Sequence, residues 1–203
     1  ENAARAGGVG VAGLRAAEVA VAEAAQAQAF RAWAQARSDC TSAVRALPEA
    51  EAGPALVHLA TIAQATGEHR QAVRLFERSA EAGTTAALTR LGDYYNFGIR
   101  PIREDIPRAI GLYEDASEAG DPAAAATLSM MHQLGRGVPR NPERQIDLMR
   151  SAADTGYAFA QYRLAQLFLT GEGLPEDALA GLGLPNPVAA IPYLAGAARA
   201  GND

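Results

Sequence analysis

Residues 120–137 read GDPAAAATLSMMHQLGRG, and the frame in this stretch occurs three times along the chain. Counted from Gly120, an alanine follows after four residues, a leucine after eight, a small residue after nine and a glycine after fifteen. The same frame begins at Gly83 and at Gly156. Spacings of four residues place the alanine and the leucine on one helical stripe. Each stretch is therefore predicted to be an amphipathic helix that ends at its second glycine.

The fourth residue after the leucine extends this stripe, and it is Tyr95, His132 or Phe168. An aromatic ring at this position is expected to pack in the interior of each unit. His132 is interpreted as a buried or half-buried substitute for tyrosine, and the alternative is a pH-sensitive seam between units. The small residue beside each leucine leaves room for a neighbouring helix to approach closely.

A second frame precedes each closing glycine. Residues 72–83 carry apolar side chains at Ala72, Val73, Leu75 and Phe76, and the frame returns in residues 109–120, 145–156 and 190–201. The closing glycines are 37, 36 and 45 residues apart, and the longest interval predicts a protruding loop over Glu176–Val188. A two-helix unit cannot bury its own apolar stripe, so the units are predicted to stack into an all-α solenoid.

Composition agrees with a helical fold and excludes several kinds of function. Alanine is abundant while aromatic residues make up 6% of the 203 residues, which favours helices over sheets. A net charge of -5 argues against a nucleic-acid partner. The 18 basic residues are all arginine, so lysine Schiff-base and P-loop chemistry are excluded. The lone Cys40 cannot form an internal disulfide.

The repeated frame resembles Sel1-like repeats, the relatives of tetratricopeptide repeats, over Ala72–Gly201. Arg100 and Gln145 depart from the pattern of the family, as do His132 and the inserted loop. Upstream, residues 56–76 are similar to a plain tetratricopeptide unit with a turn at Gly67. The resemblance implies an α/α solenoid that acts as a non-catalytic scaffold in bacterial envelope assembly, signalling or host interaction.

The predicted organisation has three parts: a flexible leader at 1–13, an N-terminal helical region at 14–53 and a solenoid at 54–203 with units 54–82, 83–119, 120–155 and 156–200. A long alanine-rich helix is expected from Leu14 to Arg37. Ser38 or Asp39 would then cap a short helix that ends near Leu47. Residues 201–203 resemble the start of another unit, so we expect the chain to continue beyond Asp203, and the alternative is that another molecule covers this end.

No apparatus for catalysis or metal binding is visible in the sequence. The three histidines, His58, His69 and His132, include no pair with ligand spacing, so neither a metal nor a cofactor is expected. There is no Gly-X-Ser-X-Gly motif, and no histidine lies near Cys40. The lone cysteine also argues against the β-lactam chemistry credited to cysteine-rich members of the family. No apolar run reaches the roughly 18 residues of a membrane span. The chain is predicted not to be an enzyme.

In the tetratricopeptide-like frame, the first helix of each unit lines a concave groove. Its inward positions follow the opening glycine by three, six, ten, thirteen and fourteen residues. The predicted partner-binding residues are Thr61, Gln64, Thr89, Asp93, Asn96, Phe97, Met130, Gln133, Leu134, Phe159, Tyr162, Gln166 and Leu169. The mixture of amides and large apolar side chains is typical of an interface for a protein or peptide. The alternative is that several of these side chains pack between units.

Two functions remain open. The first is a scaffold that binds a protein or peptide partner in the groove. The second is an accessory region that positions a catalytic domain outside residues 1–203. Family resemblance and the absence of an initiator methionine favour a periplasmic location, with a cytoplasmic scaffold as the alternative.

Overall fold

The computed structural model of the protein describes residues 28, 31–32, 34–42, 44–48 and 51–201. The predicted leader at 1–13 and most of the alanine-rich helix expected from Leu14 lie outside these residues, as do Asn202 and Asp203. The described part contains helices and no strand, which confirms the all-α prediction.

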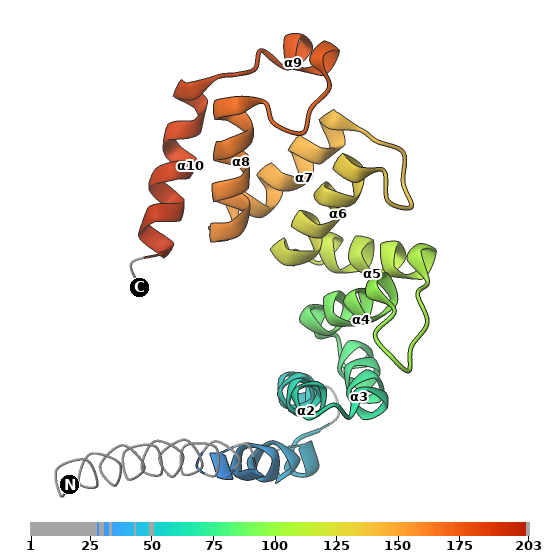
Figure 1. Ribbon diagram of the computed structural model, residues 1–203. Coiled ribbons are helices and arrows are strands. Elements are labelled where there is room, and N and C mark those ends of the chain that lie inside the picture. The colour runs from blue at the N-terminus through green and yellow to red at the C-terminus, as the bar shows by residue number, and fades with distance from the viewer. Residues whose placement is uncertain (1–27, 29–30, 33, 43, 49–50, 202–203) are drawn as a thin grey trace, which may run out of the picture.

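Four helical hairpins follow one another in an open arc (Figure 1). Each has a first and a second helix. The first helices are α2 (Gly53–Ala65), α4 (Thr85–Phe97), α6 (Pro122–Leu134) and α8 (Ala158–Thr170). The second helices are α3 (His69–Glu81), α5 (Ile106–Glu118), α7 (Pro142–Asp154) and α10 (Pro187–Ala200). A short helix, α9 (Glu176–Leu182), lies between the two helices of the last hairpin.

The ends of the helices follow from local side-chain chemistry. Asp105, Asn141 and Asn186 each accept a hydrogen bond from the backbone N–H three residues ahead, and a proline follows in the first turn. At the other end, α4, α6 and α8 stop at glycines in the left-handed conformation, as predicted. A side chain with a Cβ would be strained at these positions, so glycine sets the helix end.

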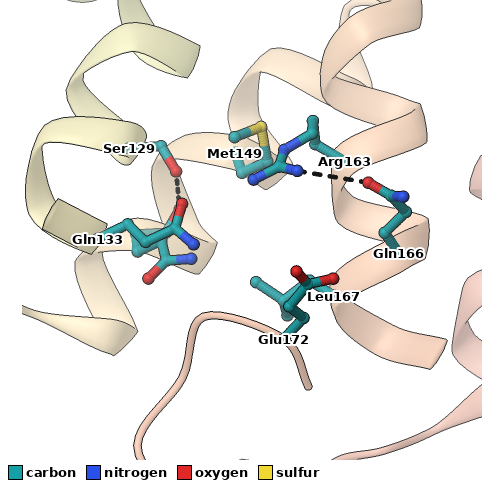
Figure 2. A pocket seen from close by; sticks show the side chains of 8 residues that line it. Ser129, Gln133, Met149, Arg163, Gln166, Leu167 and Glu172 are labelled. Carbon is teal, nitrogen blue, oxygen red and sulfur yellow. Dashed lines mark hydrogen bonds between the residues drawn. The ribbon is translucent and has the colours of Figure 1, made fainter. Parts of the chain in front are cut away.

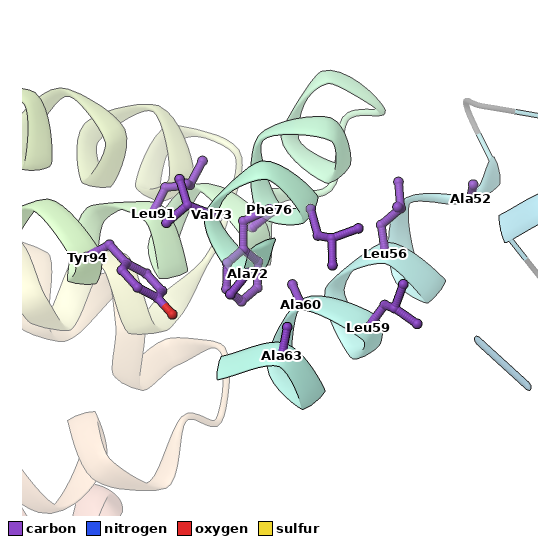
Figure 3. Close-up of a cluster of buried hydrophobic side chains, with 12 residues drawn as sticks. Ala52, Leu56, Leu59, Ala60, Ala63, Ala72, Val73, Phe76, Leu91 and Tyr94 are labelled. Carbon is purple, nitrogen blue, oxygen red and sulfur yellow. The ribbon is translucent and has the colours of Figure 1, made fainter. Parts of the chain in front are cut away.

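The core runs between hairpins, as the solenoid prediction requires. Phe76 of α3 is fully buried and shares a cluster with Leu91 and Tyr94 of the next hairpin (Figure 3). The predicted leucine stripe is confirmed, because Leu91, Leu128 and Leu164 are at most 4% exposed. Each unit therefore completes the core of its neighbour.

The third position of the stripe differs from the prediction at Tyr95, which is only half-buried. His132 is half-buried, within the predicted range, and Phe168 is buried. The residue one position earlier is buried in all three units: Tyr94, Met131 and Leu167. A helix has 3.6 residues per turn, so residues three and four places after the leucine are near the same face. In all three units the residue three places after the leucine is buried, whereas the residue four places after it is buried only in α8.

The insertion and the N-terminal region also differ from the expectations. The predicted loop at Glu176–Val188 contains α9, and the backbone N–H of Asn186 donates to the carbonyl of Phe168 at 2.7 Å.

Ser38 and Asp39 lie inside a helical stretch that covers residues 34–42 and 44–46, so neither caps a new helix. The side chain of Ser42 instead donates to the carbonyl of Ser38, which is compatible with a continuous helix.

Within the described residues, no single helix is long and apolar enough to cross a membrane. Only α9 and α10 taken together meet the requirement of length and composition, and they are bent by 89° at the break between them.

Candidate functional site

Large apolar side chains are exposed on three of the first helices. The exposed fractions are 64% for Phe97 and 63% for Leu134, with 51% for Tyr162, 43% for Phe159 and 39% for Leu169. We call these five residues the first-helix surface. Apolar side chains that gather on one face of a protein are typical of interaction sites. Aromatic residues in such a group are the usual anchors of a binding partner.

The repeat itself sets the position of this surface. Phe97 is the last residue of α4 and Leu134 is the last residue of α6, each directly before a left-handed glycine. They occupy the same place in successive units, so the stacking of the units places the two side chains one after the other along the solenoid. Tyr162 lies in the next unit, where its hydroxyl accepts a hydrogen bond from the amide of Gln166 at 3.0 Å.

A small polar hollow of about 40 Å³ lies between the third and fourth hairpins. Gln133 of α6, Arg163 of α8 and Glu172 of the following turn point into it (Figure 2). Arg163 contacts Gln166 at 3.4 Å. The hollow therefore offers an amide, a guanidinium and a carboxylate, which suit the polar groups of a peptide backbone or side chain.

A larger hollow of about 500 Å³ lies where the turn of the third hairpin approaches the turn of the fourth. Leu134 and Gln133 line one side, and Leu174 and Pro175 line another. Arg140 contributes the positive charge. Because Leu134 also belongs to the first-helix surface, an apolar contact there continues directly into this hollow.

The thirteen predicted binding residues fall into three groups. Six are exposed: Thr61, Phe97, Leu134, Phe159, Tyr162 and Leu169. Five are half-buried: Gln64, Asp93, Met130, Gln133 and Gln166. Thr89 and Asn96 are buried, at 8% and 4% exposed.

Thr89 and Asn96 depart from the expected exposure because the next unit covers them. The hydroxyl of Thr89 donates to the carboxylate of Asp121 at 2.7 Å. The side-chain oxygen of Asn96 accepts from Nε of Arg136 at 2.9 Å, and its carbonyl accepts from the same guanidinium. These two side chains pack between units, which was the alternative to binding a partner, and their hydrogen bonds link neighbouring units.

Asp93 lies beside this seam and takes part in a hydrogen bond within its own hairpin. The hydroxyl of Tyr113 donates to its carboxylate at 2.8 Å, and Arg90 lies 3.8 Å away. Burial raises the pKa of Asp93 despite these two partners, which oppose the rise. Burial and the neighbouring carboxylate also raise the pKa of Tyr113. Asp93 is thus a partly desolvated group at the edge of the surface.

Arg136 is a structural residue that was not among the predicted ones. It lies in a repeat turn, between two glycines that both have positive φ. Its side chain reaches back over one unit to Asn96 and also lies 3.5 Å from Glu104. In the sequence, an arginine between two turn glycines gives little indication of a contact with the preceding unit, because that contact depends on how the units are stacked.

The residues that the structure describes do not form a metal centre. They contain no group of three or more histidine, cysteine, aspartate or glutamate side chains that could hold an ion. The surface instead combines exposed apolar anchors with amide and charged groups, an arrangement suited to binding.

Comparison with known proteins identifies the repeats. The Sel1 repeat matches residues 66–84, 85–121, 122–157 and 158–202. The chain belongs to the Sel1 repeat family. The repeated frame of alanine, leucine and glycine is therefore the Sel1 frame, and the predicted resemblance is confirmed.

Curated relatives of the chain include proteins from a plant and a bacterium. The chain is 27% identical over 133 residues to the ERAD-associated E3 ubiquitin-protein ligase component HRD3B of Arabidopsis thaliana, covering 62% of this chain and 21% of that protein. It is 30% identical over 139 residues to the exopolysaccharide production negative regulator of Rhizobium meliloti, covering 61% of this chain and 51% of that protein. The chain thus spans at most about half the length of these two relatives.

Solved structures show the same fold. A Sel1 repeat protein from Oxalobacter formigenes superposes with a TM-score of 0.60 at 18% identity, covering 80% of this chain and 69% of that one. A putative Sel1 repeat protein from Klebsiella pneumoniae gives 0.53 at 24% identity, covering 77% and 73%. These likenesses confirm the solenoid.

Proposed function

We propose that this Sel1 repeat protein is a non-catalytic scaffold that binds a protein or peptide partner on the first-helix surface. The observation that carries the proposal is the series of exposed apolar side chains on α4, α6 and α8. Two of them, Phe97 and Leu134, are more than 60% exposed at equivalent places in successive units. A partner that covers both would remove a large apolar area from water.

Polar groups beside the apolar side chains supply the means for specificity. Gln133, Gln166 and Arg163 surround the small hollow, and Tyr162 lies next to them through its bond to Gln166. Buried polar groups need partners, so a bound peptide must offer complementary donors and acceptors at this point. The partner is therefore an apolar segment with polar groups that meet the hollow.

The names of the relatives support a role in regulation or assembly. One is a component of a ligase, one is a negative regulator and another is the chitin synthase regulatory factor 3 of Schizosaccharomyces pombe. We extend this to a role in bacterial envelope assembly or signalling. The periplasmic location stays a prediction.

A second candidate function is an accessory region that positions a catalytic domain. The match to a ligase component favours it, because the chain spans only 21% of that protein. In that case the first-helix surface would bind a substrate protein or the catalytic domain itself.

Selection from a random peptide library tests the scaffold proposal. Peptides enriched on the chain should bind at least about tenfold more weakly to a Phe97→Ser, Leu134→Ser, Tyr162→Ser variant, because anchors dominate binding energy. Leu47→Ser is the matched control, since Leu47 is an apolar residue that is 40% exposed and lies before α2, outside the surface. Equal affinity for the chain and the triple variant, or loss of binding on Leu47→Ser alone, would overturn the proposal.

A further inference from the structure

The second helix of the last hairpin exposes side chains that its counterparts bury. Ile191 and Leu194 of α10 stand where α7 has Ile146 and Met149, by alignment of the repeated frame. Ile146 is 4% exposed and Met149 is 5% exposed. Ile191 is 60% exposed and Leu194 is 39% exposed. The difference lies in what covers the helix, because the residue types are similar.

The three earlier second helices show what covers this face. In the described chain, α3, α5 and α7 each pack on the first helix of their own hairpin and on the first helix of the next. Extensive packing of α10 is confined to α8. Phe76 of α3 illustrates the usual arrangement, since its ring lies 6.2 Å from that of Tyr94 in the following hairpin.

The open face of α10 is apolar along its length. Val188 and Ile191 are followed by Ala195 and Ala198, all exposed and three or four residues apart. Arg199 is the one charged residue in this helix. A stripe of this spacing lies on one side of a helix and matches the side that a stacked helix covers.

We propose that the exposed face of α10 is a docking site for the first helix of a further Sel1-type repeat unit. This interface continues a series that the molecule already contains three times, at α3 with α4, α5 with α6 and α7 with α8. The chemistry of the occupant follows from those helices. It presents an alanine and, four residues later, a leucine, as Ala124 and Leu128 do in α6, where they are 0% and 3% exposed.

The lack of charge on this face separates it from the first-helix surface. Small side chains at Ala195 and Ala198 allow an incoming helix to approach closely, whereas the first-helix surface carries large side chains beside amides and charges. The two sites therefore bind different ligands. The exposed face of α10 binds a helix that has an apolar stripe along one side.

The test replaces Asn202 and Asp203 with a second copy of residues 121–156, so that the copy follows Gly201 directly. Amide hydrogen exchange of α10 is then compared with that of the unextended chain. Docking of the copied first helix should slow exchange in α10 by about tenfold or more, because covered helices open less often. The copied residues should also become protected.

Two variants separate docking from a nonspecific effect of added chain. Glutamate in place of the copies of Ala124 and Leu128 should abolish the additional protection, and so should Ile191→Glu in the extended chain. Three results would overturn the proposal. They are unchanged exchange in α10, equal protection from the glutamate-bearing copy, and a dimer of the unextended chain that Ile191→Glu dissociates, since a second copy would then be the occupant.

Discussion

The ring of Tyr113 in α5 lies directly against Gly92 in α4, so that a methyl group on Gly92 would be 2.6 Å from Cε1 of the tyrosine. Tyr113 is fully buried at this point of the second hairpin. The third hairpin also has a small residue at this place: the hydroxyl of Ser129 in α6 donates to the carbonyl of Gln145 in α7 at 2.6 Å. Small side chains on the first helices thus allow close approach of the second helices.

Gly92→Ala is expected to destabilise the fold by about 1–3 kcal/mol, because the added methyl group forces the buried ring of Tyr113 to move. The higher helix propensity of alanine opposes this loss by only about 1 kcal/mol. Urea unfolding followed by circular dichroism measures the change in the free energy of unfolding.

Gly111→Ala is the matched control, and the opposite sign is expected. Gly111 lies inside α5, and a Cβ there would have no atom within 4 Å. Alanine should therefore stabilise the helix by about 0.5–1 kcal/mol through its propensity alone. If both substitutions shift stability in the same direction, contact with Tyr113 does not explain the glycine at position 92.

Asn96→Ala and Tyr162→Ala should separate stability from binding. Asn96 is 4% exposed and holds Arg136 of the next unit, so its loss should lower the free energy of unfolding by about 1–2 kcal/mol. Tyr162 is 51% exposed, so its loss should weaken a selected peptide while stability changes by less than about 0.5 kcal/mol. Calorimetry and peptide titration on both variants make the comparison, and the reverse pattern would refute the assignment of the two residues.

Asp93→Asn should stabilise the fold at neutral pH. Burial raises the pKa of Asp93 in the folded chain, so the unfolded chain loses this proton more readily. Ionisation therefore costs stability as the pH rises from about 4, the ordinary carboxyl value, through the raised pKa. Asparagine cannot ionise and still accepts the hydrogen bond from Tyr113.

The advantage of Asp93→Asn should be about 1 kcal/mol or less at pH 7, since the side chain is partly exposed, and should vanish below about pH 4. Urea midpoints at pH 3.5, 5 and 7 provide the measurement. Asp147→Asn is the control, because Asp147 forms a similar 3.8 Å pair with Arg150 while 65% of its side chain is exposed. An advantage that grows as the pH falls would contradict the assigned direction.

The fold could be predicted because its repeated contacts are encoded locally. Leu91, Leu128 and Leu164 occupy fixed places in a frame of helical period, and left-handed glycines end the helices. The third position of the stripe was harder to predict, because residues three and four places after the leucine point to similar sides of the helix.

The binding surface was harder to predict, because it depends on how one unit covers the next. Phe97 and Asn96 are adjacent in the sequence, but Phe97 is 64% exposed and Asn96 is 4% exposed. Arg136, forty residues later, makes the difference by closing over Asn96. A register counted within one unit does not include a contact from the next unit.

Hydrogen exchange of the chain with and without a library-selected peptide shows whether partners bind on the first-helix surface, because it locates the bound partner without substitutions. We expect slower exchange at the C-terminal turns of α4 and α6 and along α8, where Phe97, Leu134 and Tyr162 lie. Slower exchange confined to α3, α5 and α7, with no change in the first helices, would contradict it.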